Sequence, residues 1–149
     1  GKVCLIDEAY PPEELLMDTK KMKRICVFMN VFNVHVNRSP ISGLAENIVY
    51  KKGQFLNASL DKASDKNERS SLIINSANGT KIVVVQIAGL IARRILGFIS
   101  LNHNLVQGER FGLIRFGSRV DIYMPIDAIL KCKVGDKVTA GESVLASFQ

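Results

Sequence analysis

The chain has 149 residues, of which 47% are hydrophobic and 23% are charged. A chain of this length and composition can bury a core of its own, which excludes a disordered, collagen-like or low-complexity protein. Its longest apolar stretches, near residues 25–36 and 82–92, are interrupted by polar residues and fall short of the roughly 18–20 residues that span a bilayer. We therefore predict one globular domain over residues 1–149, with no transmembrane helix or signal peptide.

Basic residues outnumber acidic ones, with 20 Lys and Arg against 14 Asp and Glu, which gives a net charge of +6. Residues 118–149 hold four of each sign, so the whole excess lies in residues 1–117. Such a surface suits an anionic partner, such as nucleic acid, acidic lipid or an anionic substrate, and it also serves solubility alone. Because only 7% of the residues are aromatic and none is Trp, stacking on single-stranded nucleic acid is poorly supported, and we expect no nucleic-acid partner.

Several segments are rich in β-branched and aromatic residues and are bounded by Gly, Pro or Asn, a pattern that predicts β-strands. In chain order they cover residues 1–6, 25–36, 44–57, 70–76, 80–87, 111–116 and 119–124. Pro11-Pro12 predicts a turn followed by one helical turn. Asn78-Gly79 is a strong signal for a β-hairpin, and the polar residues 58–67 are expected to form a loop.

In residues 86–98 the spacing of the apolar residues changes to that of a helix. Ile87, Leu90, Ile91 and Ile95 recur on one helical face, with Arg93 and Arg94 off that face, so we expect the one main helix here.

The last residues, 131–148, predict two short β pieces with turns at Gly135-Asp136 and Gly141-Glu142. This ending resembles the hairpin of biotinyl and lipoyl carrier domains, but it contains no Met-Lys-Met to carry the modification, so we read it as structural. Taken together, the elements predict a mainly β (α+β) fold, a β-sandwich or barrel-like domain with one main helix and a carrier-domain-like C-terminal hairpin.

The histidines and cysteines do not form a metal-binding pattern. Cys4, Cys26 and Cys132 have no paired spacing, so we expect no metal site and interpret the three as small buried apolar residues. His103 lies in a polar loop and is expected to be merely exposed. His35 lies on a predicted strand beside Asn and Arg, where it is either a hydrogen-bonded, half-buried residue or a general base, because its ordinary pKa suits proton transfer.

Gly117-Ser118 lies between two predicted strands. A Gly-Ser pair in such a place is usually a bend. It also has the chemistry for self-cleavage of the backbone, because Gly117 lets other groups approach its carbonyl closely and the Ser118 hydroxyl lies next to that carbonyl. A base that removes the hydroxyl proton would allow the oxygen to attack and convert the amide to an ester.

Four blocks of the chain, together with the carrier-like ending, resemble the short, prokaryotic type of phosphatidylserine decarboxylase over residues 25–149. The blocks are Asn33-Val34-His35-Val36-Asn37-Arg38 with Pro40 and Gly43, Asn67-Glu68-Arg69, Gln86-Ile87-Ala88-Gly89 with Ala92-Arg93-Arg94-Ile95, and Gly108-Glu109-Arg110-Phe111-Gly112 continuing to Phe116-Gly117-Ser118-Arg119-Val120-Asp121. No single block is specific, but their combination is.

The resemblance implies a carboxy-lyase that makes its own cofactor. Cleavage between Gly117 and Ser118 would give a large chain, residues 1–117, and a small chain, residues 118–149, whose Ser118 becomes a pyruvoyl group. His35 matches the family histidine that acts as base in self-cleavage and is implicated in proton transfer during decarboxylation. The pyruvoyl ketone supplies the electron sink that the loss of CO₂ requires, so neither pyridoxal phosphate nor a metal is needed.

The resemblance also implies the substrate and the place of action. The enzyme would convert phosphatidylserine in an anionic membrane to phosphatidylethanolamine at the cytoplasmic face of the cell membrane, and the family forms homodimers. Arg38, Arg93 and Arg94 are our candidates for holding the anionic head group, although an Arg pair such as Arg93-Arg94 is also typical of a solvated helix face. Asn67-Glu68-Arg69 matches the family without a role that the sequence explains.

The family's processing machinery includes an Asp directly before a Gly-Lys-hydrophobic sequence. Gly1-Lys2-Val3 matches that sequence, so this Asp is expected directly before Gly1, and Asp7 is out of register with it. The family's hydrophobic N-terminal segment is likewise expected upstream.

Two other classes of protein remain as alternatives. The first is a non-enzymatic, carrier-like barrel or an unprocessed degenerate homologue, which would keep the fold without splitting at Gly117-Ser118. The second is a basic nucleic-acid-binding barrel, which would show salt-dependent binding to DNA or RNA.

Overall fold

A computed structural model describes residues 1–17, 20–29, 36–60, 63–90, 94–114 and 117–148. Within these ranges most of the regular structure is β-strand, and the one α-helix is short. The predicted mainly β class is therefore confirmed. None of the helices in these ranges is long and apolar enough to cross a membrane.

The elements follow one another along the chain in a fixed order. They are β1 (Lys2–Ala9), a 3-10 helix η1 (Glu13–Leu15), β2 (Met22–Met29), β3 (Val36–Arg38), β4 (Gly43–Lys51), α1 (Ala63–Lys66), β5 (Arg69–Asn75), β6 (Lys81–Ile87), β7 (Ile95–Gly97), β8 (Asn104–Leu105), β9 (Arg110–Ile114), β10 (Ser118–Met124), β11 (Ile129–Leu130) and β12 (Ala146–Ser147).

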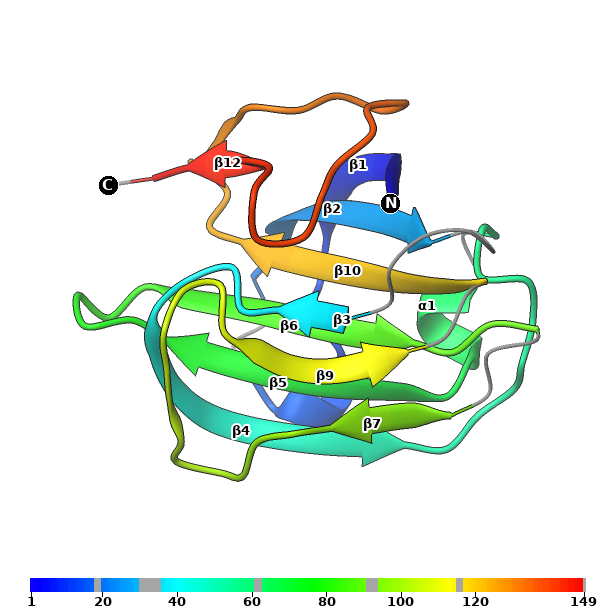
Figure 1. Ribbon diagram of the computed structural model, residues 1–149, viewed down its shortest axis with the longest axis horizontal. Helices are drawn as coiled ribbons and strands as arrows, with labels where there is room; N and C mark the ends of the chain where they lie inside the picture. Colours follow the sequence, from blue (N-terminus) through cyan, green and yellow to red (C-terminus); the bar gives the residue numbers. More distant parts are fainter. Residues whose placement is uncertain (18–19, 30–35, 61–62, 91–93, 115–116, 149) are drawn as a thin grey trace.

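Seven strands form the main sheet, in the order β1-β2-β10-β6-β5-β4-β8, with every neighbouring pair antiparallel. The β5–β6 hairpin turns at Asn78-Gly79, where Gly79 has a φ of +85°, as the sequence predicts. β10 lies between β2 and β6 although it is distant from both in the sequence (Figure 1). The start of β10 is therefore held inside a sheet and not at its edge.

A second sheet of three strands, in the order β3-β9-β7, covers one face of the main sheet (Figure 1). Phe111 and Ile114 of β9 share a buried apolar cluster with Ile74 and Val84 of the main sheet. This packing of sheet on sheet is the sandwich-like arrangement that the sequence predicts.

The opposite face of the main sheet is covered by η1 and α1. Leu15 and Ala63 from these two elements form a second buried cluster with Val83, Val85 and Ile87 of β6. Both faces of β6 are therefore buried, which explains why its sequence is a continuous apolar run without alternation.

The helix predicted over residues 86–98 is wrong within the described residues. Gln86 and Ile87 end β6, and Ile95–Gly97 form β7, while the intervening residues 91–93 lie outside the described ranges. An apolar spacing of three and four residues also arises when a strand buried on both faces runs into a second strand. The α-helix instead begins at Ala63, inside the predicted polar loop 58–67, because Ala63 and Ser64 are buried under the sheet.

The C-terminal segment packs beside the start of the chain. β11 pairs with β12, and Gly135 and Gly141 make the predicted turns with φ values of +98° and +80°. The amide of Val138 donates to the carbonyl of Gly1 at 2.9 Å, which ties this segment to the N-terminus.

The prediction that all three cysteines are buried is only partly right. Cys26 is fully buried, whereas Cys4 and Cys132 are half-buried because they lie near the edges of the fold.

Candidate active site

Ser118 begins β10, opposite Met29 of β2. Directly before it, the amide of Gly117 donates to the carbonyl of Met29 at 2.7 Å. Gly117 has a φ of +78°, a conformation that a residue with a side chain rarely adopts. The sequence interpretation of Gly117-Ser118 as a bend is therefore compatible with the structure, and the bend fixes the peptide bond between the two residues against β2.

The Ser118 hydroxyl is fully buried, and its oxygen has no hydrogen-bond partner among the described residues. A buried hydroxyl without a partner costs about 1–3 kcal/mol, so a fold that retains one at this place is unusual. A side chain of this kind, directly after a glycine with a positive φ, fits the residue that a pyruvoyl group would be made from.

Two buried amide side chains lie near Ser118. Gln86 donates to the Oδ1 of Asn37 at 2.8 Å, and the amide of Asn37 lies 3.9 Å from the sulfur of Met29, the cross-strand partner of Ser118. Neither residue was singled out by the sequence as polar and buried. The signal that was available is their position in the two matched blocks, next to apolar residues on predicted strands.

His35 and Arg93 lie outside the described residues, so their predicted roles remain predictions. Val36, which follows His35 directly, lines a pocket. Asn37 lies against Met29, as described above.

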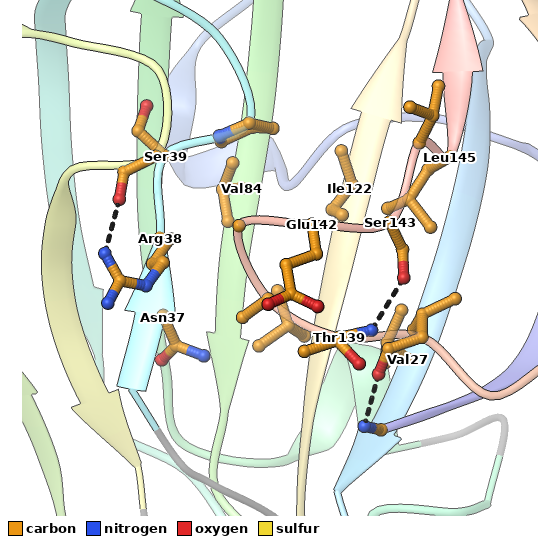
Figure 2. A pocket seen from close by; sticks show the side chains of 18 of the residues that line it. Val27, Asn37, Arg38, Ser39, Val84, Ile122, Thr139, Glu142, Ser143 and Leu145 are labelled. Atoms are coloured by element: carbon orange, nitrogen blue, oxygen red, sulfur yellow. Dashed lines mark hydrogen bonds between the residues drawn. The ribbon is translucent and has the colours of Figure 1, made fainter.

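The pocket has a volume of about 1020 Å³ and lies between the main sheet, β3 and the C-terminal segment. Figure 2 shows Asn37 and Arg38 on one side and the segment from Thr139 to Leu145 on the other. Its walls are mostly apolar, and charged groups stand among them. The charged residues that line it are Lys2, Arg38, Arg110, Lys137 and Glu142.

Ser118 belongs to the strand that forms one wall of this pocket, although it is not itself among the residues that line it. Val120, Ile122 and Met124 all line it, and side chains two residues apart on a strand share a face. Ser118 is the next residue in that row and faces the same side. Apolar walls beside a cluster of cations suit an amphipathic anionic ligand.

Arg38 and Arg94, two of the predicted binding residues, lie in different surroundings. Arg38 lines the pocket and donates to the carbonyl of Gly108 at 2.8 Å, which leaves guanidinium donors for a ligand. Gly141 passes so close that a Cβ there would lie 2.8 Å from the Cδ of Arg38. Arg94 is exposed and is not among the residues that line this pocket.

On the opposite face of β10, a buried ionic cluster lies behind the site. The Nε of Arg119 donates to the Oδ1 of Asp121 at 2.7 Å, and the hydroxyl of Ser64 donates to the Oδ2 at 2.7 Å. Arg119 and Asp121 are both fully buried. Arg24 joins the cluster at 3.8 Å from Asp121 and also forms an ion pair with Asp7 at 2.6 Å.

This cluster changes the titration of its neighbours. Burial, and then the charge of Asp121, raises the pKa of the Cys26 thiol and of the Tyr123 hydroxyl, so both stay protonated. Burial is the largest single effect and lowers the pKa of Arg119, but the hydrogen bond to Asp121 and the charges nearby, that of Asp121 first, together outweigh burial and leave the pKa raised. The sequence analysis missed the cluster, although two opposite charges at alternate positions of an otherwise apolar strand were visible.

The Asn67-Glu68-Arg69 block also gains structural partners. Arg69 forms a bidentate pair with Glu14 of η1, at 2.7 and 2.8 Å, and this hydrogen bonding lowers the pKa of Glu14. Glu68 accepts a hydrogen bond from the hydroxyl of Tyr50. The block thus fastens η1 and β4 to the start of β5, and its Arg69–Glu14 pair lies on the face of the sheet that carries the ionic cluster.

The family model of phosphatidylserine decarboxylase matches residues 3–146, nearly the whole chain. No solved structure matches this chain. The family match includes all four blocks and the carrier-like ending.

Proposed function

Because the chain belongs to the phosphatidylserine decarboxylase family, we propose that it splits itself between Gly117 and Ser118 and then decarboxylates phosphatidylserine to phosphatidylethanolamine. The observation that carries the proposal is the buried Ser118 hydroxyl without a hydrogen-bond partner among the described residues, directly after a glycine with a φ of +78°. The proposal extends the family assignment to a specific bond and a specific residue of this chain.

The first step is an attack within the chain. Once a base has taken the hydroxyl proton, the Oγ of Ser118 forms a bond to the carbonyl carbon of Gly117. The bond from that carbon to the nitrogen of Ser118 then breaks, and the nitrogen takes up a proton. The product is an ester between the Gly117 carboxyl and the Ser118 side chain, with a free amine on Ser118.

The second step is an elimination. The Cα of Ser118 loses a proton, and the Gly117 carboxylate leaves with the electrons of its bond to the side chain. The chain is then split, and residue 118 carries a carbon–carbon double bond beside its amine. Rearrangement and addition of one water release ammonia and leave the pyruvoyl group at the start of the small chain.

We assign the removal of the hydroxyl proton to His35. Its neighbours support this role, since Val36 lines the pocket and Asn37 lies against the strand partner of Ser118. The acidic residue that the resemblance implies directly before Gly1 would join the chain beside β2, since a Cβ on Gly1 would lie 2.6 Å from the side chain of Val27 and 3.6 Å from that of Met29.

The pyruvoyl group supplies the electron sink for the loss of CO₂. The pocket residues would bind and orient the lipid. We assign to Arg38 the phosphate or carboxylate of the head group, because its guanidinium reaches the pocket with donors to spare. The apolar walls, with Val84, Ile122 and Leu145, suit the hydrocarbon beside it (Figure 2).

We also place the reaction at the cytoplasmic face of the cell membrane. A net charge of +6 favours contact with anionic lipid over neutral lipid. Co-sedimentation with vesicles of phosphatidylserine and phosphatidylcholine, compared with vesicles of phosphatidylcholine alone, measures this preference. Equal binding to both would contradict the electrostatic part of the proposal.

The activity itself is tested by incubating the chain, with an Asp directly before Gly1, with phosphatidylserine in mixed micelles and measuring CO₂ and phosphatidylethanolamine. The Ser118→Ala variant is the control and should form neither product. A chain that splits normally but releases no CO₂ from phosphatidylserine would contradict the substrate and leave self-cleavage standing. Arg38→Gln should raise KM more than it lowers kcat, since it removes a binding group.

A further inference from the structure

The carbonyl of Gly117, which belongs to the bond proposed to break, faces the backbone of Gly89. A Cβ built on Gly89 would overlap the Gly117 carbonyl oxygen and would lie 2.8 Å from its carbon, closer than real Cβ atoms come. Gly89 is buried and its φ needs no glycine, so close approach is the reason for a glycine here. The oxygen concerned is the atom that gains negative charge when the Ser118 hydroxyl attacks.

The residue before Gly89 is tied down by Asn67. The side-chain amide of Asn67 donates to the carbonyl of Ala88 at 2.8 Å and to the carbonyl of Leu56 at 2.8 Å. Its oxygen accepts from the amide of Leu56 at 2.9 Å. Asn67 is 2% exposed, so both donors and its oxygen are used in a buried setting.

A second set of contacts holds the backbone around Ala88 and Gly89. Ala88 also donates from its amide to the carbonyl of Glu68 at 3.0 Å. On the far side, the Cβ of Ala58 would lie 3.5 Å from a Cβ on Gly89, and Arg119 holds the carbonyl of Ala58 at 3.3 Å. The backbone behind the Gly117 carbonyl therefore has little room to move away.

We infer that Asn67 and Gly89 are positioning residues for self-cleavage. Asn67 fixes the backbone at Ala88. Gly89 lets the Gly117 carbonyl lie against that backbone, in the position where the Ser118 hydroxyl attacks it. The inference rests on the proposed function, which supplies the reaction. It gives Asn67 of the Asn67-Glu68-Arg69 block a role that the sequence did not explain.

The first variant is Gly89→Ala, with Gly97→Ala as its matched control. An added Cβ at Gly97 meets no atom within 4 Å, so this control makes the same chemical change without a clash. In Gly89→Ala the Gly117 carbonyl must move by about 1 Å, and a misplacement of that size slows a reaction by about 100-fold. The splitting rate is followed by denaturing gel and intact mass, in the chain that carries an Asp before Gly1.

The second variant is Asn67→Asp, with Asn104→Asp, at an exposed position of strand β8, as its control. Asp has the same shape but cannot donate to the two carbonyls when it is ionised, so we expect splitting to slow by about tenfold or more. The folding of each variant is checked by its thermal midpoint in the Ser118→Ala background, where no splitting occurs. If one variant does not fold, the other decides the question.

Two readouts separate positioning from general weakening of the fold. Hydroxylamine cleaves the ester of the first step and releases a small chain that still begins with Ser118. A displaced carbonyl slows ester formation, so hydroxylamine should not restore splitting in either variant. Because both residues act on the same carbonyl, the double variant should be little slower than the slower single variant, whereas independent effects would multiply.

Each result has one meaning. Folded Gly89→Ala and Asn67→Asp chains that split at the rates of their controls would overturn the inference while self-cleavage stands. Rapid cleavage of both by hydroxylamine would also overturn it, because the ester would then form normally. If the parent chain does not split even with Asp before Gly1, the proposed function fails first and the inference with it.

Discussion

The buried pair of Arg119 and Asp121 yields a prediction about stability that can be worked from the structure. In Asp121→Ala, the guanidinium of Arg119 loses the partner at 2.7 Å, and Ser64 loses its acceptor at 2.7 Å. The side chains of Arg119 and Asp121 are 0% and 1% exposed, so water cannot replace the lost carboxylate. Removing one member of such a pair costs about 3–5 kcal/mol, and we expect a loss of that size in the free energy of unfolding.

The matched control removes an acid from an exposed ion pair. Glu13 lies 3.9 Å from Lys51 and its side chain is 88% exposed, so Glu13→Ala should cost less than about 1 kcal/mol. Asp121→Asn keeps the size of the side chain without its charge and should fall between the two. The contrast between the variants measures the burial of the pair and not the mere loss of a carboxylate.

The assay is urea unfolding of each variant in the Ser118→Ala background, where the chain stays in one piece and a two-state analysis applies. The same loss should lower the thermal midpoint by roughly 6–20 °C. An Asp121→Ala chain that is no less stable than Glu13→Ala would refute the reasoning. It would mean that the charge of Arg119 is satisfied by the hydroxyl of Ser64 and the carbonyls of Ala58 and Leu60.

Three further predictions concern the site and its supports. Ser118→Ala should abolish both the splitting of the chain and the release of CO₂, and retention of either would remove Ser118 from its role. His35→Ala should block or greatly slow splitting, as seen by intact mass, while His103→Ala in the exposed loop should not; normal splitting of His35→Ala would exclude His35 as the base. The folded pKa of Glu14 lies below its unfolded value because of Arg69, so the pair stabilises the fold above the unfolded pKa and loses this effect as the pH falls through the folded pKa. Urea midpoints between about pH 5 and about pH 3 should therefore fall less steeply in Glu14→Gln than in the parent, and parallel profiles would contradict the shift.

The parts of the fold that depend on local patterns were predictable. The β5–β6 hairpin follows from Asn78-Gly79, because the turn places a positive φ at Gly79, and the glycine turns near the C-terminus follow for the same reason. The strands of the sheet follow from runs of β-branched residues. The helix over 86–98 was wrong because spacing alone does not separate a helix from strands that are buried on both faces.

The arrangement of the site depends on pairings between distant segments, which no local pattern contains. Nothing in the sequence says that Ser118 lies opposite Met29, or that the Gly117 carbonyl meets Gly89. Asn67 illustrates the limit, since its block was recognised but its partners, Leu56 and Ala88, come from two other segments. The family was predictable from the residues of the blocks, whereas the geometry around Ser118 was not.

The central claim is that the chain makes its own cofactor at Ser118. The most direct test is the denaturing intact mass of the protein with an Asp directly before Gly1. The account predicts two chains that separate between Gly117 and Ser118, with the smaller one, residues 118–149, lighter than its sequence by one ammonia. A single chain of the full sequence mass would contradict it and would favour an unprocessed homologue that keeps the fold without the reaction.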